Sequence, residues 1–155
     1  MSYIDLSNTL RDWPYEAEKI SVRKILGSDG IVRIQMRVEL GVVQMEADHR
    51  PDGARPFGCD TILDYHRKRL QAHLTMNGTP LGFALTPQEC HGLRVEGSMF
   101  YRRYVAYFVL EEYDSVVRDT SHSLDILDMC HEHAMEPEDR ESLEEFRPYI
   151  LMMNA

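Results

Sequence analysis

Residues 31–45 show an apolar–polar alternation with a period of two. The apolar members of its first part are Ile34, Met36, Val38 and Leu40. Because successive side chains of a strand point to opposite faces, this spacing predicts a strand with one apolar face. The turn sequence GSDG at residues 27–30 joins it to a shorter apolar segment, which predicts an N-terminal β-hairpin over about residues 19–47. Gly41 reverses the phase of the alternation, and we interpret it as a β-bulge.

From Asp60 onward the apolar spacing becomes helical. A first helix is expected to begin with Asp60 as its N-cap and to end at Asn77-Gly78. His66 lies on the apolar stripe of this helix, so we expect it to be a hydrogen-bonded core residue. The sequence Thr86-Pro87-Gln88-Glu89 is typical of a capping box with proline in the first turn, which predicts the start of a second helix.

Two more helices complete the predicted fold. The sequence Glu111-Glu112 separates the second helix from a third, and a last helix is expected after Pro137, with Pro148 kinking or ending it. At 155 residues, the chain is long enough for one domain with its own core. We therefore predict a single α+β domain over residues 1–155. In it, the β-hairpin packs on a mostly antiparallel helical bundle over about residues 60–154.

Composition narrows the class of protein. Hydrophobic residues make up 43% of the chain and charged residues 28%, which is ordinary for a globular domain in water. No apolar run approaches the roughly 18 residues that a membrane span requires. The N-terminal sequence MSYIDLSNTL lacks the features of a signal peptide, and three cysteines without a disulfide spacing fit reduced thiols. These features predict a cytoplasmic protein without a membrane partner.

The net charge of −9 is concentrated toward the C-terminus. Residues 111–155 contain 13 acidic side chains and three arginines, a balance of −10, whereas residues 1–110 contain 13 acidic and 14 basic side chains, a balance of +1. Nucleic-acid binding requires clustered cations, so this distribution argues against it. We interpret the acidic part as a solvated helical face.

The segment around Tyr113 resembles the helical hairpin of tetratricopeptide repeats. The matching positions are Ala106, Tyr107, Tyr113, Val117, Ser123 and Leu124. Tyr104 and Val116 depart from the pattern, because the family has small residues there. One copy of about 34 residues is visible, whereas stacked arrays need at least ~3 copies. The resemblance therefore implies a single tetratricopeptide-like helix pair.

The whole chain also resembles an uncharacterised bacterial protein family that is common in planctomycetes. The resemblance is carried by RIQMRVELGVVQMEADHRPDG, by DYHRKRL and by the C-terminal FRPYILMMNA. Some members of that family continue into a C-terminal motif shared by the excision-repair proteins B and C, which this sequence does not contain. The resemblance supplies neither a reaction nor catalytic residues.

Cysteine and histidine gather at two places, Cys90-His91 and Cys130-His131-Glu132-His133. If the second and third helices form an antiparallel hairpin, residues whose numbers sum to about 223 face each other, so the two clusters converge. Thiolate and imidazole together suit zinc. The simpler interpretation is a polar helix end with a buried structural cysteine. The best ligand set for zinc combines Cys90 or His91 with Cys130 and with His133 or a carboxylate.

Other signals for catalysis are weak. Asp119 and His122 lie one helical turn apart, as do Asp128 and His131, and such pairs can orient an imidazole for acid–base chemistry. On an acidic helix we interpret them as exposed ion pairs. The serines lack the context of a nucleophile elbow, and neither a phosphate-binding loop nor a dinucleotide fingerprint occurs.

The loop after the predicted hairpin contains Arg50-Pro51-Asp52-Gly53 and Arg55-Pro56-Phe57-Gly58. Proline and glycine at these positions predict a rigid corner between sheet and helices. Arg50 and Arg55 also flank the N-terminus of the following helix, whose free amides favour an anion. Three nearby aspartates would neutralise both arginines, so the corner is the preferred interpretation and an anion-binding site at Arg50 and Arg55 is the alternative.

Together these observations favour a non-enzymatic protein-interaction or regulatory module with an unidentified protein partner. The alternative is a metal-binding sensor or metal-dependent enzyme that uses the Cys90/His91 and Cys130/His133 clusters, with zinc as the cofactor. Because an isolated two-stranded ribbon is marginally stable and leaves unpaired edges, we also expect a homodimer formed through the β-hairpin.

Overall fold

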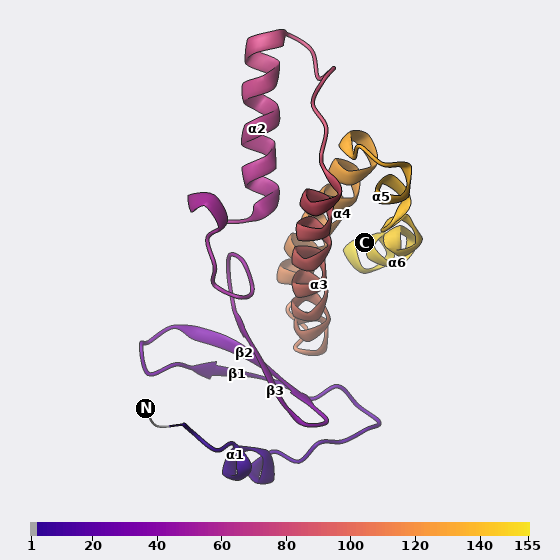
Figure 1. Cartoon of the computed structure of the whole chain (residues 1–155). Coiled ribbons are helices and arrows are strands. Elements are labelled where there is room, and N and C mark those ends of the chain that lie inside the picture. Colours follow the sequence, from indigo (N-terminus) through magenta and orange to yellow (C-terminus); the bar gives the residue numbers. More distant parts are fainter. Residues whose placement is uncertain (1–2) are drawn as a thin grey trace.

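The computed structural model describes residues 3–155 of the chain. A short helix precedes three strands, and helices follow to the C-terminus (Figure 1). The elements are α1 (Ser7–Asp12), β1 (Val22–Leu26), β2 (Val32–Val38), β3 (Gly41–Glu46), the 3-10 helix η1 (Pro56–Gly58), α2 (Ile62–Asn77), α3 (Pro87–Val109), α4 (Tyr113–His133), α5 (Pro137–Glu141), the 3-10 helix η2 (Glu144–Phe146) and α6 (Arg147–Asn154).

The predicted α+β class is confirmed, and the sheet has one strand more than the predicted hairpin. Its strand order is β1-β2-β3, and both neighbouring pairs are antiparallel. Val38 pairs with Gly41, so Glu39 and Leu40 form a two-residue turn where we expected a β-bulge at Gly41. Two-residue hairpin turns are recognised in a sequence by Asn-Gly, Asp-Gly or a turn glycine. Glu39-Leu40 has none of these, which is why the alternation alone predicts one long strand.

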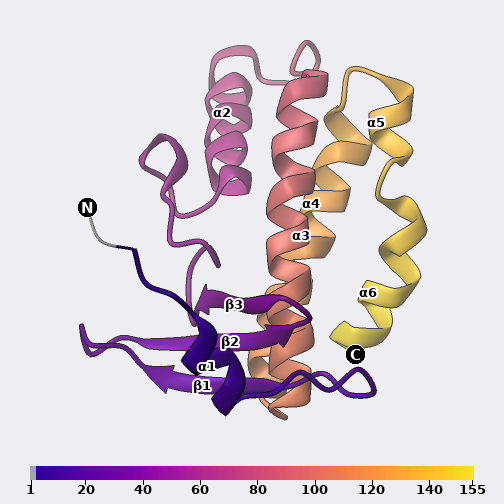
Figure 2. The same cartoon turned by 60° about the horizontal axis from the view of Figure 1, so that its bottom comes forward.

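The two faces of the sheet contact different parts of the chain. The face that carries Ile34 and Met45 is apolar and packs with Tyr104 of α3. The opposite face is polar, and α1 lies on that side (Figures 1 and 2). There the Nε of Arg37 donates a hydrogen bond of 2.6 Å to the carbonyl oxygen of Trp13. The sheet is thus a layer between α1 and the long helices.

The N-cap of helix α2 lies one residue after the N-cap that the sequence predicts. Its N-cap is Thr61 and not Asp60, because Thr61 Oγ1 accepts a hydrogen bond of 3.0 Å from the backbone amide of Asp64. Asp60 instead lies 3.3 Å from Arg55 in an ion pair. The predicted C-terminal end is confirmed, since Gly78 has the left-handed φ of 70° that favours glycine at this position.

Helices α3 and α4 form an antiparallel pair in the centre of the molecule. The predicted capping box is present: Thr86 Oγ1 accepts from the Glu89 amide at 3.2 Å, and Glu89 Oε1 accepts from the Thr86 amide at 3.0 Å. The predicted break lies between Val109 and Tyr113. The sheet and α2 lie on one side of this helix pair, and α5 and α6 lie on the other (Figures 1 and 2).

The C-terminal segment forms two short helices where the sequence predicts one. Helix α5 begins at Pro137 as expected. Pro148 lies in the first turn of α6, where the missing amide of proline removes no helical hydrogen bond. At the other end of α6, Asn154 Nδ2 donates a hydrogen bond of 2.9 Å to Thr120 Oγ1 of α4. Helix α6 therefore covers one side of the α3–α4 pair.

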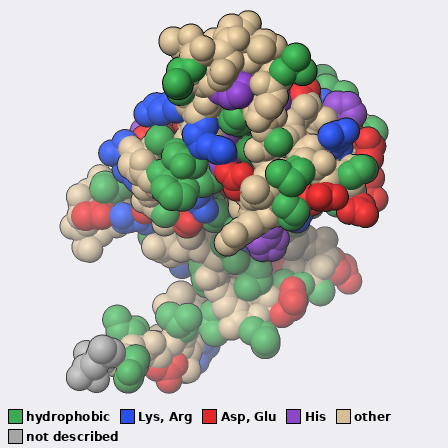
Figure 3. All heavy atoms as spheres, turned by 45° about the horizontal axis from the view of Figure 1, so that its top comes forward, with side chains coloured by type: hydrophobic (Ala, Val, Ile, Leu, Met, Phe, Trp, Pro, Cys, Tyr) green, Lys and Arg blue, Asp and Glu red, His purple; other side chains and the backbone are tan. Residues whose placement is uncertain are grey.

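On the face shown in Figure 3, acidic and basic side chains gather in different places. In the upper part of Figure 3, Lys and Arg side chains lie mostly left of centre, and Asp and Glu side chains lie mostly on the right, where α5 and α6 are found in Figure 1. Asp119 is a buried exception within the acidic part of the sequence. No helix formed by residues 3–155 is long and apolar enough to cross a membrane. The outer strands β1 and β3 have no further strand beside them in this part of the chain, and self-association through the sheet stays a prediction.

Candidate functional site

The predicted approach of the two Cys/His clusters holds for their cysteines. Cys90 of α3 and Cys130 of α4 are buried in the same apolar cluster. Burial raises the pKa of both thiols, that of Cys130 to about 12. At pH 7 both thiols therefore keep their protons, which a metal ion would have to displace on binding.

The histidines of these clusters do not complete a zinc site. His91 is exposed, and His133 packs edge-on against Phe83 with ring centroids 5.2 Å apart. Among residues 3–155, no group of three His, Cys, Asp or Glu side chains could hold a metal ion. The ligand set drawn from Cys90, His91, Cys130 and His133 is thus not assembled in this conformation.

The loop between β3 and α2 contains the predicted rigid corner. The amide of Gly53 donates a hydrogen bond of 2.9 Å to the carbonyl oxygen of Arg50, and Gly53 has a φ of 74°. Arg50 Nε lies 3.1 Å from Asp52 Oδ1, an ion-pair contact whose angle does not make it a hydrogen bond. Arg55 is exposed and pairs with Asp60. Both arginines therefore have the local acidic partners that the sequence indicates.

The N-terminus of α2 does bind an anionic group, but that group is the protein's own Glu96. Its carboxylate accepts hydrogen bonds from the amides of Ile62 at 2.7 Å and Leu63 at 3.2 Å. Arg50 Nη1 lies 3.5 Å from the same carboxylate, which is 0% exposed. The anion-binding hypothesis for Arg50 and Arg55 requires free amides, and this requirement is not met. An external anion would have to displace Glu96.

A charged cluster extends from Glu96 between α3 and α4. His122 Nε2 lies 3.0 Å from Glu96 Oε2, and the His122 ring stacks on Phe100 with centroids 4.0 Å apart. Arg103 donates to both carboxylate oxygens of Asp119, at 2.8 and 2.9 Å. The expectation of an exposed Asp119–His122 ion pair is wrong, because each lies inside the helix pair and contacts a different partner. The name "charged cluster" below denotes Glu96, Arg103, Asp119 and His122.

The carboxylates of the charged cluster already have several partners each. Glu96 contacts two helix amides and His122. Asp119 also accepts a hydrogen bond of 3.0 Å from Arg118 Nε. Arg103 donates 3.1 Å to the carbonyl oxygen of Glu46, at the end of β3. Acid–base catalysis needs a group that can exchange a proton with a substrate. These contacts instead fasten the end of β3 and the start of α2 to the α3–α4 pair.

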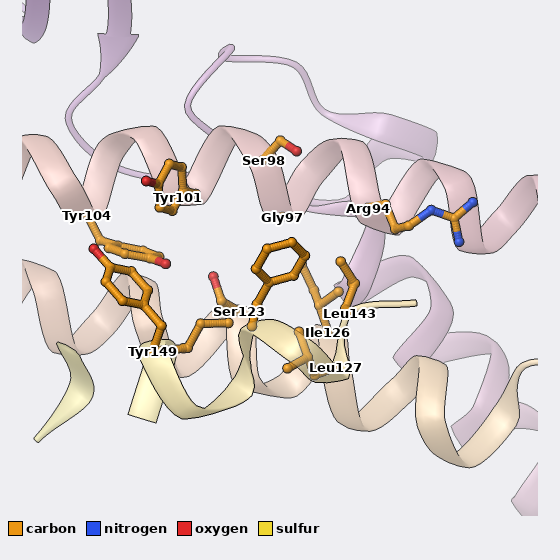
Figure 4. A pocket seen from close by; sticks show the side chains of 12 residues that line it. Arg94, Gly97, Ser98, Tyr101, Tyr104, Ser123, Ile126, Leu127, Leu143 and Tyr149 are labelled. Atoms are coloured by element: carbon orange, nitrogen blue, oxygen red, sulfur yellow. The ribbon is translucent and has the colours of Figure 1, made fainter. Parts of the chain in front are cut away.

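On the opposite side of α3 and α4, a cavity of about 360 Å³ lies beneath α6 (Figure 4). This is about twelve times the ~30 Å³ that one water molecule occupies in the liquid. It is open to solvent on one side, because the lining residues Tyr101 and Phe146 are each 49% exposed. The cavity is lined by Arg94, Gly97, Ser98, Tyr101, Tyr104, Ser123, Ile126, Leu127, Leu143, Phe146, Tyr149 and Ile150.

The cavity lining is mainly apolar, with tyrosines at one end and an arginine at the other. At one end lie Tyr101, Tyr104 and Tyr149 (Figure 4). Burial raises the pKa of Tyr104 and Tyr149 above the ordinary value, so both are neutral phenols at pH 7. At the other end, Arg94 pairs with Asp139 at 2.9 Å. The charge of Arg94 is therefore balanced within the protein.

Gly97 and Ser123 face this space from the two central helices. A Cβ atom at Gly97 would meet nothing within 4 Å, so its missing side chain leaves open space beside α3. Ser123 is only 4% exposed, and its Oγ has no hydrogen-bond partner among the described residues. In Figure 4 this oxygen is directed into the space bounded by Tyr149 and Gly97. Because buried hydroxyls are usually hydrogen-bonded, Ser123 marks a position where a partner is missing.

The sequence contains one signal for this cavity. Gly97 lies on the apolar stripe of its helix, between Leu93 and Phe100. A glycine on a buried stripe leaves a gap unless a large residue of the facing helix fills it. Ser123, which lines the same space from α4, is also small.

No protein-family model, characterised protein or solved structure matches this chain. Function is therefore inferred from the geometry of the cavity and of the charged cluster.

Proposed function

We propose that the protein is a non-enzymatic regulatory module that binds a small, mainly apolar molecule in the cavity between α3, α4 and α6. The observation that carries this proposal is the cavity of about 360 Å³ beside Gly97. Its volume lies at the lower end of the range of ~300–1,000 Å³ that is typical of small-molecule sites. An apolar lining with few polar groups is also typical of such sites.

The regulatory part of the proposal comes from α6, which forms one wall of the cavity through Tyr149 and Ile150. At the start of α6, Arg147 Nη1 contacts Asp128 of α4 at 2.9 Å. At the end of α6, Asn154 contacts Thr120 of the same helix α4. A bound molecule would add contacts that exist only when α6 is docked. Such a molecule shifts the population toward the docked state. Occupancy is thereby coupled to the surface that α6 presents to a protein partner.

A catalytic role has less support than this binding role. The charged cluster lies on the other side of the α3–α4 pair, and its carboxylates are bonded to neighbouring side chains and helix amides.

Binding of 2-methylnaphthalene and 2-naphthol, measured by ligand-observed NMR and thermal unfolding, tests the proposal. Both probes are small, flat and mainly apolar. The variant Gly97→Leu fills the cavity, whereas Gly92→Leu makes the same change on α3 at a glycine outside the cavity lining. We expect wild type and Gly92→Leu to bind at least one probe, and Gly97→Leu to bind at least about tenfold more weakly. Absence of binding of both probes to wild type would show that the proposal is wrong.

Hydrogen exchange of the α6 amides tests the regulatory part separately. We expect exchange in residues 147–154 to slow when a probe saturates the cavity, because ligand stabilises only the docked state. Binding without any change in α6 exchange would leave a ligand site but remove the coupling to α6.

A further inference from the structure

The buried hydroxyl of Ser123 restricts the chemistry of the molecule that fits the cavity. Three residues earlier on the same helix, Thr120 Oγ1 donates 2.7 Å to the carbonyl oxygen of Val116. A hydroxyl on α4 can therefore be satisfied by the helix backbone, yet Ser123 Oγ makes no such bond. An unbonded buried hydroxyl is unfavourable. A ligand group that bonds to Ser123 would remove this cost.

The charges around the cavity favour a neutral ligand. Arg94 is already paired with Asp139, and the nearby phenols of Tyr104 and Tyr149 are neutral. An ion that binds against an apolar lining without a counter-ion loses part of its hydration and gains little in return. Carboxylates and amines are therefore disfavoured in this cavity.

The shape of the lining favours a ring. Four aromatic side chains from α3, η2 and α6 contribute to the walls, namely Tyr101, Tyr104, Phe146 and Tyr149. Aromatic side chains pack favourably against other rings in offset or edge-on arrangements. The rings of Tyr101 and Tyr149, which come from different helices, lie 6.3 Å apart.

We infer that the ligand is a neutral, ring-containing molecule with a hydrogen-bonding group, and that this group bonds to Ser123 Oγ inside the cavity. The inference rests on the proposed function, because it names the chemistry of the molecule bound at the same site. A serine hydroxyl both donates and accepts, so a hydroxyl, carbonyl or amide group of the ligand fits.

The test compares three probes of similar shape: 2-naphthol, 2-methylnaphthalene and 2-naphthoate. The first two differ by a hydroxyl in place of a methyl group, and the third adds a negative charge. We expect wild type to bind 2-naphthol about tenfold more tightly than 2-methylnaphthalene, which corresponds to one net hydrogen bond, and to bind 2-naphthoate most weakly. In Ser123→Ala the preference for 2-naphthol should disappear. The control Ser115→Ala, which alters a serine of α4 outside the cavity lining, should retain it.

The outcomes separate this inference from the proposed function. If 2-methylnaphthalene binds wild type as tightly as 2-naphthol does, or if Ser123→Ala keeps the preference, the cavity is a ligand site but Ser123 does not select the ligand. Tight binding of 2-naphthoate would contradict the neutral ligand. If no probe binds, both the inference and the proposed function are wrong.

Discussion

The α3–α4 pair has two sides of opposite character. Toward the sheet and α2, Glu96, Asp119 and their partners are buried charges that are bonded to one another or to helix amides. Toward α6, the lining is mainly apolar, yet it borders open space and contains an unbonded hydroxyl. Neighbouring residues lie on the two sides. Glu96 of α3 and His122 of α4 belong to the charged cluster, and the next residues, Gly97 and Ser123, line the cavity.

The difference shows which side is complete within the chain. Buried charges are tolerated only when they are paired, and the charged cluster meets this condition. It can therefore act as a structural fastening that needs no ligand. The apolar lining that faces open space has few packing partners, and the Ser123 hydroxyl has no hydrogen-bond partner among the described residues. A ligand would supply both, so the side under α6 is the incomplete one.

The largest expected effect comes from breaking the buried ion pair. Asp119→Ala leaves the guanidinium of Arg103, only 1% exposed, without the carboxylate it contacts. We expect a loss of about 3–5 kcal/mol in the free energy of unfolding, measured by urea denaturation. The double variant Arg103→Met with Asp119→Leu removes both charges and should recover most of this loss. A single variant that loses less than about 1 kcal/mol would show that the pair does not fasten the two helices.

A smaller loss is expected when Glu96 keeps its shape but loses its charge. Glu96→Gln weakens the hydrogen bonds from the amides of Ile62 and Leu63, because a charged acceptor at a helix N-terminus is stronger than a neutral one. We expect a loss of about 1.5–3 kcal/mol in the free energy of unfolding. The control Glu132→Gln alters an exposed glutamate at the end of α4 and should change it by less than about 0.5 kcal/mol. Equal effects of the two changes would contradict the role of Glu96.

Features that depend on neighbouring residues can be predicted from the sequence, whereas features that depend on tertiary contacts cannot. The capping box at Thr86, the end of α2 at Gly78 and the turn at Gly53 are local, because each depends on residues within a few positions of one another. The sequence also places Cys90 near Cys130 through the geometry of an antiparallel hairpin. Such signals position the elements of the fold well.

The charged cluster depends on tertiary contacts that no local pattern contains. Glu96 and Arg103 are buried by contacts with α4, with the start of α2 and with the end of β3, which lie far apart in the sequence. The third strand is missed because Glu39-Leu40 lacks a turn signature. The cavity could be predicted only in part: Gly97 indicates a gap, but the docking of α6 that borders it does not follow from a stripe pattern.

Removing either of two hydroxyls of α4 should change the free energy of unfolding by about 1 kcal/mol, but in opposite directions. Ser123→Ala removes a buried group without a partner, so we expect the free energy of unfolding of the ligand-free protein to rise by about 1 kcal/mol. Thr120→Val removes a hydroxyl that bonds to Val116 and Asn154, and it should lower this free energy by about 1 kcal/mol or more. A loss of stability in Ser123→Ala, measured by urea denaturation, would mean that the Ser123 hydroxyl has a partner in solution and that the side under α6 is already complete.

The smallest effect compares two glycines of α3. Alanine at Gly92 or Gly97 should stabilise the helix by about 0.5–1 kcal/mol, because glycine is unfavourable inside a helix. At both positions a Cβ atom meets nothing within 4 Å, but only at Gly97 does it enter the cavity. There the added methyl group becomes partly buried, so we expect Gly97→Ala to exceed Gly92→Ala by a few tenths of a kcal/mol in thermal unfolding. If α6 packed directly on Gly97, the methyl group would overfill the contact and cost about 1–3 kcal/mol. A destabilised Gly97→Ala beside a stabilised Gly92→Ala would therefore show that the space under α6 is closed in solution.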